Sequence, residues 1–289
     1  MSLILGKQFG VKPGVEISAP FDSPIATYEL HQSQLNTLVG MCAKRFEFEH
    51  IQHLPKGSNV SQYRMSQGLA AHAVMDSVLS GDRRPLGTIM NDKWDQFVMP
   101  NLIEVNYDKA LDEYESNVQN ALHYINSNFD PLLVESEKRF RIPEIWQLSD
   151  KLNGVDERWS FVGSMDLIEL DDATMTAKIV DLKFRDRTNA ANNRSSSQHA
   201  MYALAAAYYG YEPSFKYVEF VRGKIIEQCV PTGEGETEWL FIKARQAIDY
   251  IQNNNYPINP SGWFCSRKYC SYWSQCRGKY EQDIEDENV

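Results

Sequence analysis

Residues 161–184, with the sequence FVGSMDLIELDDATMTAKIVDLKF, contain two runs in which apolar and polar side chains alternate. Because the side chains of a β-strand repeat every two residues, these runs predict strands near 159–170 and 176–184. The segment Asp171–Thr174 between them is rich in residues that favour turns. The sequence therefore predicts a β-hairpin.

Three charged side chains of this hairpin are candidates for chemistry. Asp181 and Lys183 are two residues apart, so they share one face of the second strand. In the first strand, Asp166 is expected to share a face with Ser164 and Ile168. Carboxylates bind Mg²⁺ and Mn²⁺, and a lysine beside the ion can steady a water nucleophile or the charge growing on phosphorus. The hairpin indicates metal-assisted phosphodiester hydrolysis. Taken alone, however, such a pattern is more often found in hairpins whose two aspartates are solvated and have no catalytic role.

Two flanking segments contain side-chain pairs with helical spacing. Gly68 and His72 are four residues apart, and so are Gln198 and Tyr202. Residues four apart lie on the same face of a helix. A lone helical histidine is more often a partly buried core residue than a ligand, and the second pair alone is typical of an ordinary helix surface. The two pairs support a functional site only in combination with the hairpin.

Taken in order, these segments resemble the motifs of the RecB-like branch of the PD-(D/E)XK nuclease superfamily. The matching residues are Gly68-x-x-x-His72, Gly163-x-x-Asp166, Asp181-x-Lys183 and Gln198-x-x-x-Tyr202. The resemblance implies an α/β fold, with a central mixed sheet flanked by helices and with helical additions at the N-terminus. The family core of helix, three antiparallel strands, helix and strand is matched by segments near 62–79, 133–142, 159–170, 176–184, 196–209 and 215–222.

The resemblance also implies roles for individual residues. The ligands of one or two Mg²⁺ or Mn²⁺ ions would be His72, Asp166, Asp181 and the main-chain carbonyl of Leu182. Lys183 would be the catalytic lysine. Gln198 and Tyr202 would position the scissile phosphate or the lysine.

Four of the five cysteines form a second candidate site. Cys265, Cys270 and Cys276 are closely spaced near the C-terminus, and Cys42 lies near the N-terminus. No secretory signal is visible, so a reducing compartment is expected, which favours metal binding over disulfides. Thiolates at such short spacing close around one soft metal or a cluster. The remaining cysteine, Cys229, is expected to be a buried free thiol in a strand or at its edge.

The cysteine pattern resembles the iron–sulfur staple of some RecB-like nucleases, including AddB-type helicase–nuclease subunits and the nuclease of CRISPR spacer acquisition. In those proteins a 4Fe-4S cluster ties the two chain ends together. The aromatic-rich segment 262–276 also resembles the tail of stand-alone RecB-like exonucleases of bacteriophages. Two features depart from the pattern, namely the four-residue first gap of the trio and Ala43, where proline often follows the first cysteine. A Cys₄ zinc site is the alternative.

Length and composition suit a single nuclease domain over residues 1–280. The chain has 289 residues, of which 43% are hydrophobic, so it can bury a full core. It contains no apolar run long enough to predict a membrane span. The net charge of −10 argues against a generic nucleic-acid coat, and part of it comes from segment 281–289, expected to be a disordered acidic tail.

Basic and amide side chains cluster on the second hairpin strand and in the loop that follows it. They are Lys183, Arg185, Arg187 and Arg194, together with Asn189, Asn192 and Asn193. Such a loop is a candidate for contacts with backbone phosphates. A solvated connection between strand and helix is the alternative.

The sequence thus predicts a metal-dependent deoxyribonuclease in the cytoplasm of a bacterial or phage-infected cell. The expected activity is exonucleolytic, on single-stranded DNA or DNA ends, with an endonuclease side activity, in recombination, repair or phage DNA processing. Recombination or replication proteins are expected partners, and nothing resembles a base-reading module. The alternatives are a non-catalytic DNA-binding protein and a CRISPR-adaptation-like subunit that acts within an assembly, with a Cys₄ zinc site. The intact set of four motifs favours the nuclease.

Overall fold

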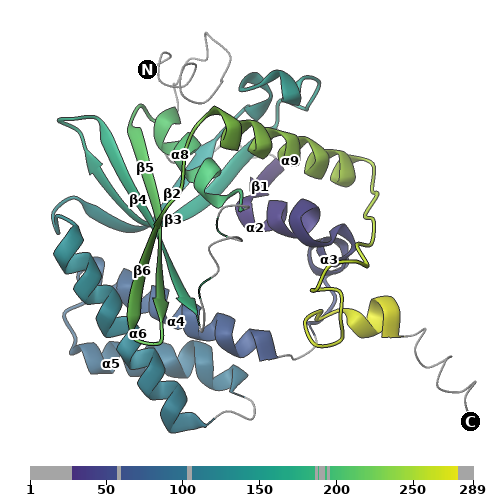
Figure 1. Ribbon diagram of the computed structural model, residues 1–289. Coiled ribbons are helices and arrows are strands. Elements are labelled where there is room, and N and C mark those ends of the chain that lie inside the picture. The colour runs from purple at the N-terminus through teal and green to yellow at the C-terminus, as the bar shows by residue number, and fades with distance from the viewer. Residues whose placement is uncertain are drawn as a thin grey trace, which may run out of the picture.

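The computed structural model describes one mixed β-sheet with helices packed on both of its faces (Figure 1). The described residues are 28–56, 60–102, 106–185, 188, 193 and 196–278. The predicted α/β fold with a central mixed sheet is confirmed. The predicted tail at 281–289 lies outside the described residues. Within the part of the chain described here, no helix is both long and apolar enough to cross a membrane.

The sheet has six strands, and it contains every strand that the sequence predicts. They are β1 (Tyr28–His31), β2 (Val134–Ile142), β3 (Trp159–Asp171), β4 (Thr176–Arg185), β5 (Glu212–Val221) and β6 (Lys224–Cys229). Strands β2, β3 and β4 are antiparallel neighbours, and β5 pairs parallel to β4. The sequence did not predict β1, which pairs parallel to β3.

The helices form two layers, one on each face of the sheet. The longer ones are α4 (Val60–Leu79), α5 (Leu86–Lys93), α6 (Tyr107–Asn128), α8 (Gln198–Tyr208) and α9 (Glu234–Gln252). Short helical turns include α2 (Gln32–Leu35), the π-helical turns Asn36–Met41 and Glu47–Ile51, and α3 (Ala43–Phe46). Helices α4, α5 and α6 share one apolar core with the sheet, and α8 and α9 share the other.

Strand β3 changes face at Asp166. Leu167 packs in the core under α4, and Ile168 packs in the core under α8, as alternation requires. Met165 also packs under α8, although it is three residues before Ile168. Strict alternation cannot place both on one face. The expectation that Asp166 shares a face with Ile168 is therefore wrong, because the alternation breaks at the aspartate.

Strands β3 and β4 separate at the same point. Their pairing runs from Asp171 opposite Thr176 to Leu167 opposite Val180, and no further. Beyond this point β4 continues beside β5, while β1 pairs with β3 from Trp159 to Val162. The edge of β3 over residues 163–166 thus lacks a strand partner within the described chain. We call this opening between β3 and β4 the fork.

Gly163 is required at the fork because the ring of Phe140 lies across its backbone. A Cβ atom at Gly163 would lie 2.7 Å from Cζ of Phe140. The ring cannot easily move, since Phe140 is buried and packs edge-on against Tyr202 at 5.7 Å between centroids. Gly68 in α4 differs, because a Cβ there would have no neighbour within 4 Å.

These two glycines should respond oppositely to substitution by alanine. Gly163→Ala overpacks the core and is expected to lower the free energy of unfolding by about 1–3 kcal/mol. Gly68→Ala removes a glycine from a helix and is expected to raise it by about 0.5–1 kcal/mol. Urea unfolding followed by circular dichroism measures both. Equal stability of the two variants would contradict this account of Gly163.

Candidate functional site

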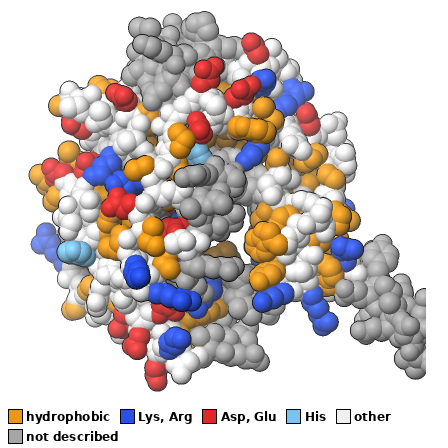
Figure 2. Space-filling model, in the orientation of Figure 1, with side chains coloured by type: hydrophobic (Ala, Val, Ile, Leu, Met, Phe, Trp, Pro, Cys, Tyr) orange, Lys and Arg blue, Asp and Glu red, His pale blue; other side chains and the backbone are white. Residues whose placement is uncertain are grey.

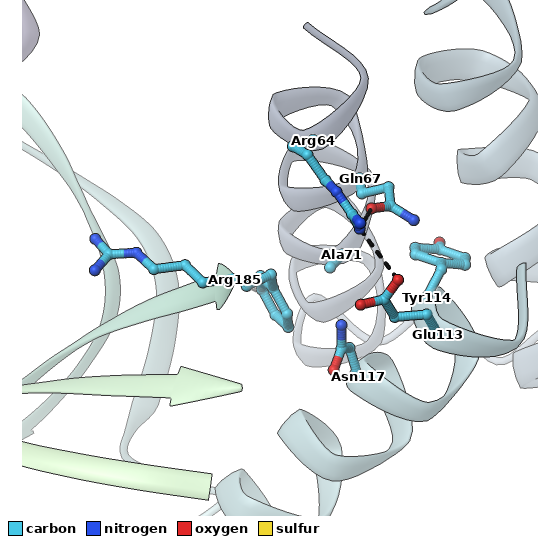
Figure 3. A pocket seen from close by; sticks show the side chains of 8 residues that line it. Arg64, Gln67, Ala71, Glu113, Tyr114, Asn117 and Arg185 are labelled. Atoms are coloured by element: carbon cyan, nitrogen blue, oxygen red, sulfur yellow. Dashed lines mark hydrogen bonds and ion pairs between the residues drawn. The ribbon is translucent and has the colours of Figure 1, made fainter. Parts of the chain in front are cut away.

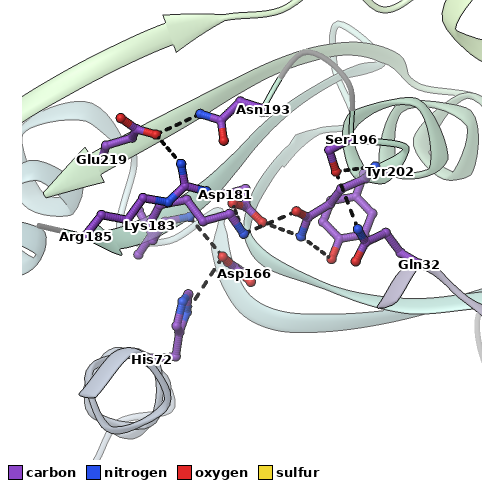
Figure 4. A network of polar contacts seen from close by, with 12 residues as sticks. Gln32, His72, Asp166, Asp181, Lys183, Arg185, Asn193, Ser196, Tyr202 and Glu219 are labelled. Atoms are coloured by element: carbon purple, nitrogen blue, oxygen red, sulfur yellow. Dashed lines mark hydrogen bonds and ion pairs between the residues drawn. The ribbon is translucent and has the colours of Figure 1, made fainter. Parts of the chain in front are cut away.

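The fork brings together the side chains that the sequence motifs single out (Figure 4). Strand β3 contributes Asp166, and β4 contributes Asp181 and Lys183. Helix α4 contributes His72 from one face of the sheet, and α8 contributes Gln198 and Tyr202 from the other. Residues from four elements, up to 130 positions apart, therefore meet at one place.

His72 and the amide of Leu182 both approach Asp166. The His72 Nδ1 atom lies 3.7 Å from Oδ2 of Asp166. The Leu182 N–H donates a hydrogen bond of 2.9 Å to the same oxygen. Burial lowers the pKa of His72. The imidazole is therefore neutral near pH 7, which is the form that binds metal ions.

Asp181 is fully buried and is held by a network from α8. Gln198 Nε2 donates to Oδ1 of Asp181 at 2.5 Å, and Lys183 Nζ lies 2.6 Å from its Oδ2. Lys183 Nζ also donates to Oε1 of Gln198 at 3.2 Å, and Gln198 Nε2 lies 3.1 Å from the Tyr202 hydroxyl. One amide thus orients both the carboxylate and the ammonium. This geometry favours positioning of the lysine over positioning of the phosphate as the role of Gln198.

The pKa values of both buried aspartates are raised. Burial raises the pKa of Asp166 to about 6. Burial, and then the neighbouring carboxylate of Asp166, raise the pKa of Asp181 to about 7. Lys183 acts in the opposite direction on both groups. Two carboxylates and one ammonium leave a net charge of about −1 when both acids are ionised, and a divalent cation would offset this negative charge.

A residue that the sequence reasoning missed adds to this site. One ligand atom from each of His72, Glu137 and Asp166 lies within 4.8 Å of the others. Glu137 is in β2, and the Ser164 hydroxyl donates to its Oε2 at 2.7 Å. The run of charged residues from 135 to 139 gave no signal that distinguished this glutamate from its neighbours. An imidazole nitrogen with carboxylate oxygens is a donor set that suits Mn²⁺ and Mg²⁺.

A cavity of about 250 Å³ adjoins the site between α4, α6 and the end of β4 (Figure 3). It lies next to the site because Ala71 precedes His72 and Phe184 follows Lys183. Two arginines line it, and each is paired with a glutamate. Arg185 Nη1 lies 2.6 Å from Glu219, and Arg64 Nη1 lies 3.1 Å from Glu113.

The loop predicted to contact phosphates is described only in part. Asn193 Nδ2 donates to the buried Glu219 at 2.9 Å, so this asparagine belongs to the network that fixes Arg185. The other predicted members of the loop, Arg187, Asn189, Asn192 and Arg194, lie outside the described residues.

The four predicted cysteines also come together. Cys42, Cys265, Cys270 and Cys276 line one pocket, beside which the C-terminal segment passes α3 (Figure 1). The two chain regions are joined by hydrogen bonds of the main chain of Lys44 to Pro257 (3.3 Å) and of Asn259 Nδ2 to Met41 (2.9 Å). Burial, and the neighbouring thiols, raise the pKa of Cys270 and Cys276.

The surroundings of this pocket are basic and aromatic. Lys44, Arg45 and Arg277 line it, which would offset the negative charge of thiolates. Hydrophobic side chains gather on the surface over this segment (Figure 2), and Trp263 there is 66% exposed. Cys229, by contrast, is exposed at the end of β6, so the expectation of a buried thiol is wrong. Every side chain of β6 is exposed or only partly buried, and β6 is an edge strand of the sheet.

Comparisons with known proteins agree with the fold. The family model of the PD-(D/E)XK nuclease superfamily matches residues 29–277. A solved structure from Eubacterium rectale, titled as a candidate exonuclease, aligns with a TM-score of 0.53 and 12% identity, covering 82% of this chain and 86% of that chain. The structure of SSO0001 aligns with a TM-score of 0.45 and 16% identity, covering 87% of this chain and 86% of that chain. No curated protein matches.

The family match covers every element that forms the fork, from β1 to α9, and also the cysteine segment. The chain belongs to the PD-(D/E)XK nuclease superfamily.

Proposed function

We propose that this nuclease is a metal-dependent deoxyribonuclease, acting as an exonuclease on single-stranded DNA or DNA ends. The observation that supports it most is the convergence of His72, Asp166, Asp181 and Lys183 in the fork. The Eubacterium rectale protein of similar fold is titled as a candidate exonuclease, which accords with the exonuclease assignment. Recombination, repair or phage DNA processing would supply such ends.

In this proposal His72, Asp166, Asp181 and the Leu182 carbonyl hold one or two divalent ions. A bound ion would polarise the phosphate and lower the pKa of an attacking water. Lys183, held by Gln198, places its ammonium beside Asp181, where it can stabilise negative charge on the phosphate oxygens. Gln198 also receives support from Tyr202, so the lysine is oriented before substrate arrives.

We further propose a 4Fe-4S cluster on the four cysteines. The pocket that the four cysteines line also contains Lys44, Arg45 and Arg277, whose positive charge would offset the negative charge of a thiolate-bound cluster. A Cys₄ zinc site is the alternative.

The single substitutions Asp166→Ala, Asp181→Ala and Lys183→Ala should each reduce the cleavage rate by about a hundredfold or more, since each removes one preorganised charge. The assay uses end-labelled single-stranded and duplex DNA with Mg²⁺, Mn²⁺ or chelator, and circular single-stranded DNA as a substrate without ends. Glu238→Ala, on the exposed surface of α9, is the matched control and should keep full activity.

Near-normal cleavage by a folded Asp181→Ala protein would contradict the proposed function and favour a non-catalytic DNA-binding role. Rapid cleavage of circular DNA would replace the exonuclease assignment by an endonuclease. Activity that appears only after addition of a cell lysate would favour the alternative in which this chain is a subunit that cleaves DNA only within a larger assembly.

Metal binding should stabilise the protein more at alkaline than at acidic pH. The pKa values of Asp166 and Asp181 are raised from 3.8 to about 6 and about 7. In the metal-free protein, their contribution to stability is fully present below about pH 4 and is lost as pH rises through about 7. A cation binds the deprotonated carboxylates and offsets that loss.

The increase in Tm produced by Mn²⁺ over chelator should therefore be larger at about pH 8 than at about pH 5.5, as measured by differential scanning calorimetry. The double variant with Asp166→Asn and Asp181→Asn should show little increase at either pH. If Mn²⁺ raised the Tm of the natural protein equally at both pH values, metal binding would not depend on deprotonation of these two carboxylates.

Protein purified without oxygen should be brown, with broad absorption near about 400 nm, if the cysteines hold an iron–sulfur cluster. Cys42→Ser and Cys276→Ser should each bleach the colour and lower the Tm, because the cluster joins both ends of the chain. Cys229→Ser is the control, since this thiol is exposed and does not line the pocket. A colourless protein with one equivalent of zinc would support the Cys₄ alternative.

A further inference from the structure

We propose that Glu137 is a metal ligand, and that with His72 and Asp166 it forms an ion position on the α4 side of the fork. Glu137 belongs to none of the four sequence motifs. The proposal rests on the metal-dependent function argued above, and it adds a ligand from β2, a strand to which that function assigns none.

The three side chains are close enough to share one ion. Their ligand atoms lie within 4.8 Å of one another. An ion such as Mg²⁺ binds each ligand at about 2.0–2.1 Å, so ligands on opposite sides of it are about 4.2 Å apart. A small rotation of the Glu137 side chain would bring its carboxylate to the ligand separation that the ion requires, and this side chain is free to rotate because it is exposed. Asp181 is not a member of this group.

The backbone of β2 is distorted at Glu137 and regular on both sides of it. Ser136 pairs with Leu167 and Lys138 pairs with Met165, so the register is the same before and after. Glu137 has a φ of 48°. This left-handed backbone conformation is energetically unfavourable for any residue other than glycine. Of the six non-glycine residues with positive φ among those described, Glu137 is the one inside a strand.

This distortion changes the direction in which β2 points its side chains. The hydroxyl of Ser136 donates to Asp76 of α4 at 2.8 Å, which places it on the α4 face. Phe140, four residues later, packs in the core under α8 instead. Strand β3 changes face at Asp166, which is the residue opposite Glu137. Both strands thus leave regular alternation at the same pair of carboxylates, and both turn toward His72.

Two carboxylates opposite each other on neighbouring strands repel. The Glu137 carboxylate accepts a 2.7 Å hydrogen bond from the neutral Ser164 hydroxyl, which orients the carboxylate without neutralising its charge. A divalent ion bound by both carboxylates and by the His72 nitrogen supplies the charge that the pair needs.

The test is Mn²⁺ affinity, measured without DNA by isothermal titration calorimetry and by electron paramagnetic resonance of free Mn²⁺. Glu137→Gln should weaken the affinity of its site about tenfold or more, the size of effect typical when a group that supports a metal site is removed. Glu135→Gln is the matched control, because Glu135 is also exposed in β2 but pairs with Lys138 at 2.8 Å. It should bind as the natural protein does.

Glu137→Gly separates a ligand role from a structural one. Glycine adopts a φ of 48° without strain, so this variant should have an unchanged or higher Tm and yet lose Mn²⁺ affinity. If Glu137 had only a structural role and did not bind the ion, the Mn²⁺ affinity of this variant would be unchanged. Affinity within twofold of the natural protein in both Glu137 variants would overturn the proposal.

The same titrations separate this proposal from the proposed function. If Asp166→Asn weakens Mn²⁺ binding and Glu137→Gln does not, the metal centre stands and Glu137 is not part of it. If the natural protein binds no Mn²⁺, the metal-dependent function fails, and the assignment of Glu137 fails with it.

Discussion

The site depends on the separation of β3 from β4 beyond the pair Leu167 and Val180. Paired strands would leave about 5 Å between their backbones and would fill that space with hydrogen bonds. Where they separate, the edge of β3 over residues 163–166 is free of strand partners among the described residues, and β4 is held in place by β5 instead. The main-chain amide of Leu182 then donates a hydrogen bond to the side-chain carboxylate of Asp166. In a continuous sheet the acceptor of such a bond would be a main-chain carbonyl of the neighbouring strand. The fork thus turns backbone hydrogen-bonding capacity toward the carboxylates.

Helix α8 can supply the supporting amide because it lies close to the sheet. All eleven of its residues are buried, and five of them are alanines. Small side chains allow close packing of a helix on a sheet, so the first residue, Gln198, reaches Asp181. Helix α4 approaches the fork from the opposite face with His72. The two apolar cores therefore fix the spacing of the polar groups between them, and substitutions in either core should affect the site without touching it.

The cysteine pocket joins regions that the nuclease core leaves separate. Cys42 follows a π-helical turn after β1, and the trio follows α9, so a cluster bridging them would enclose most of the chain in one loop. Hydrogen bonds between Lys44 and Pro257, and between Asn259 and Met41, already hold these regions together. Because β1 pairs with β3 beside the fork, anchoring the segment after β1 also supports one border of the site.

The sequence by itself determined the hairpin, the order of strands β2 to β5, the helices of His72 and Gln198, and the list of motif residues that meet. These features follow from local periodicity and from spacing along the chain, which the sequence displays directly. The sequence did not show β1, the exposure of Cys229, the reversal of β3 at Asp166 or the presence of Glu137 in the site. Each of these depends on which strands pair, and where pairing ends, across large separations in the chain. Only the tertiary structure decides which strands pair and where the pairing ends. Regular alternation predicts the face of a side chain only while the strand remains regular, and it fails where the strand is distorted.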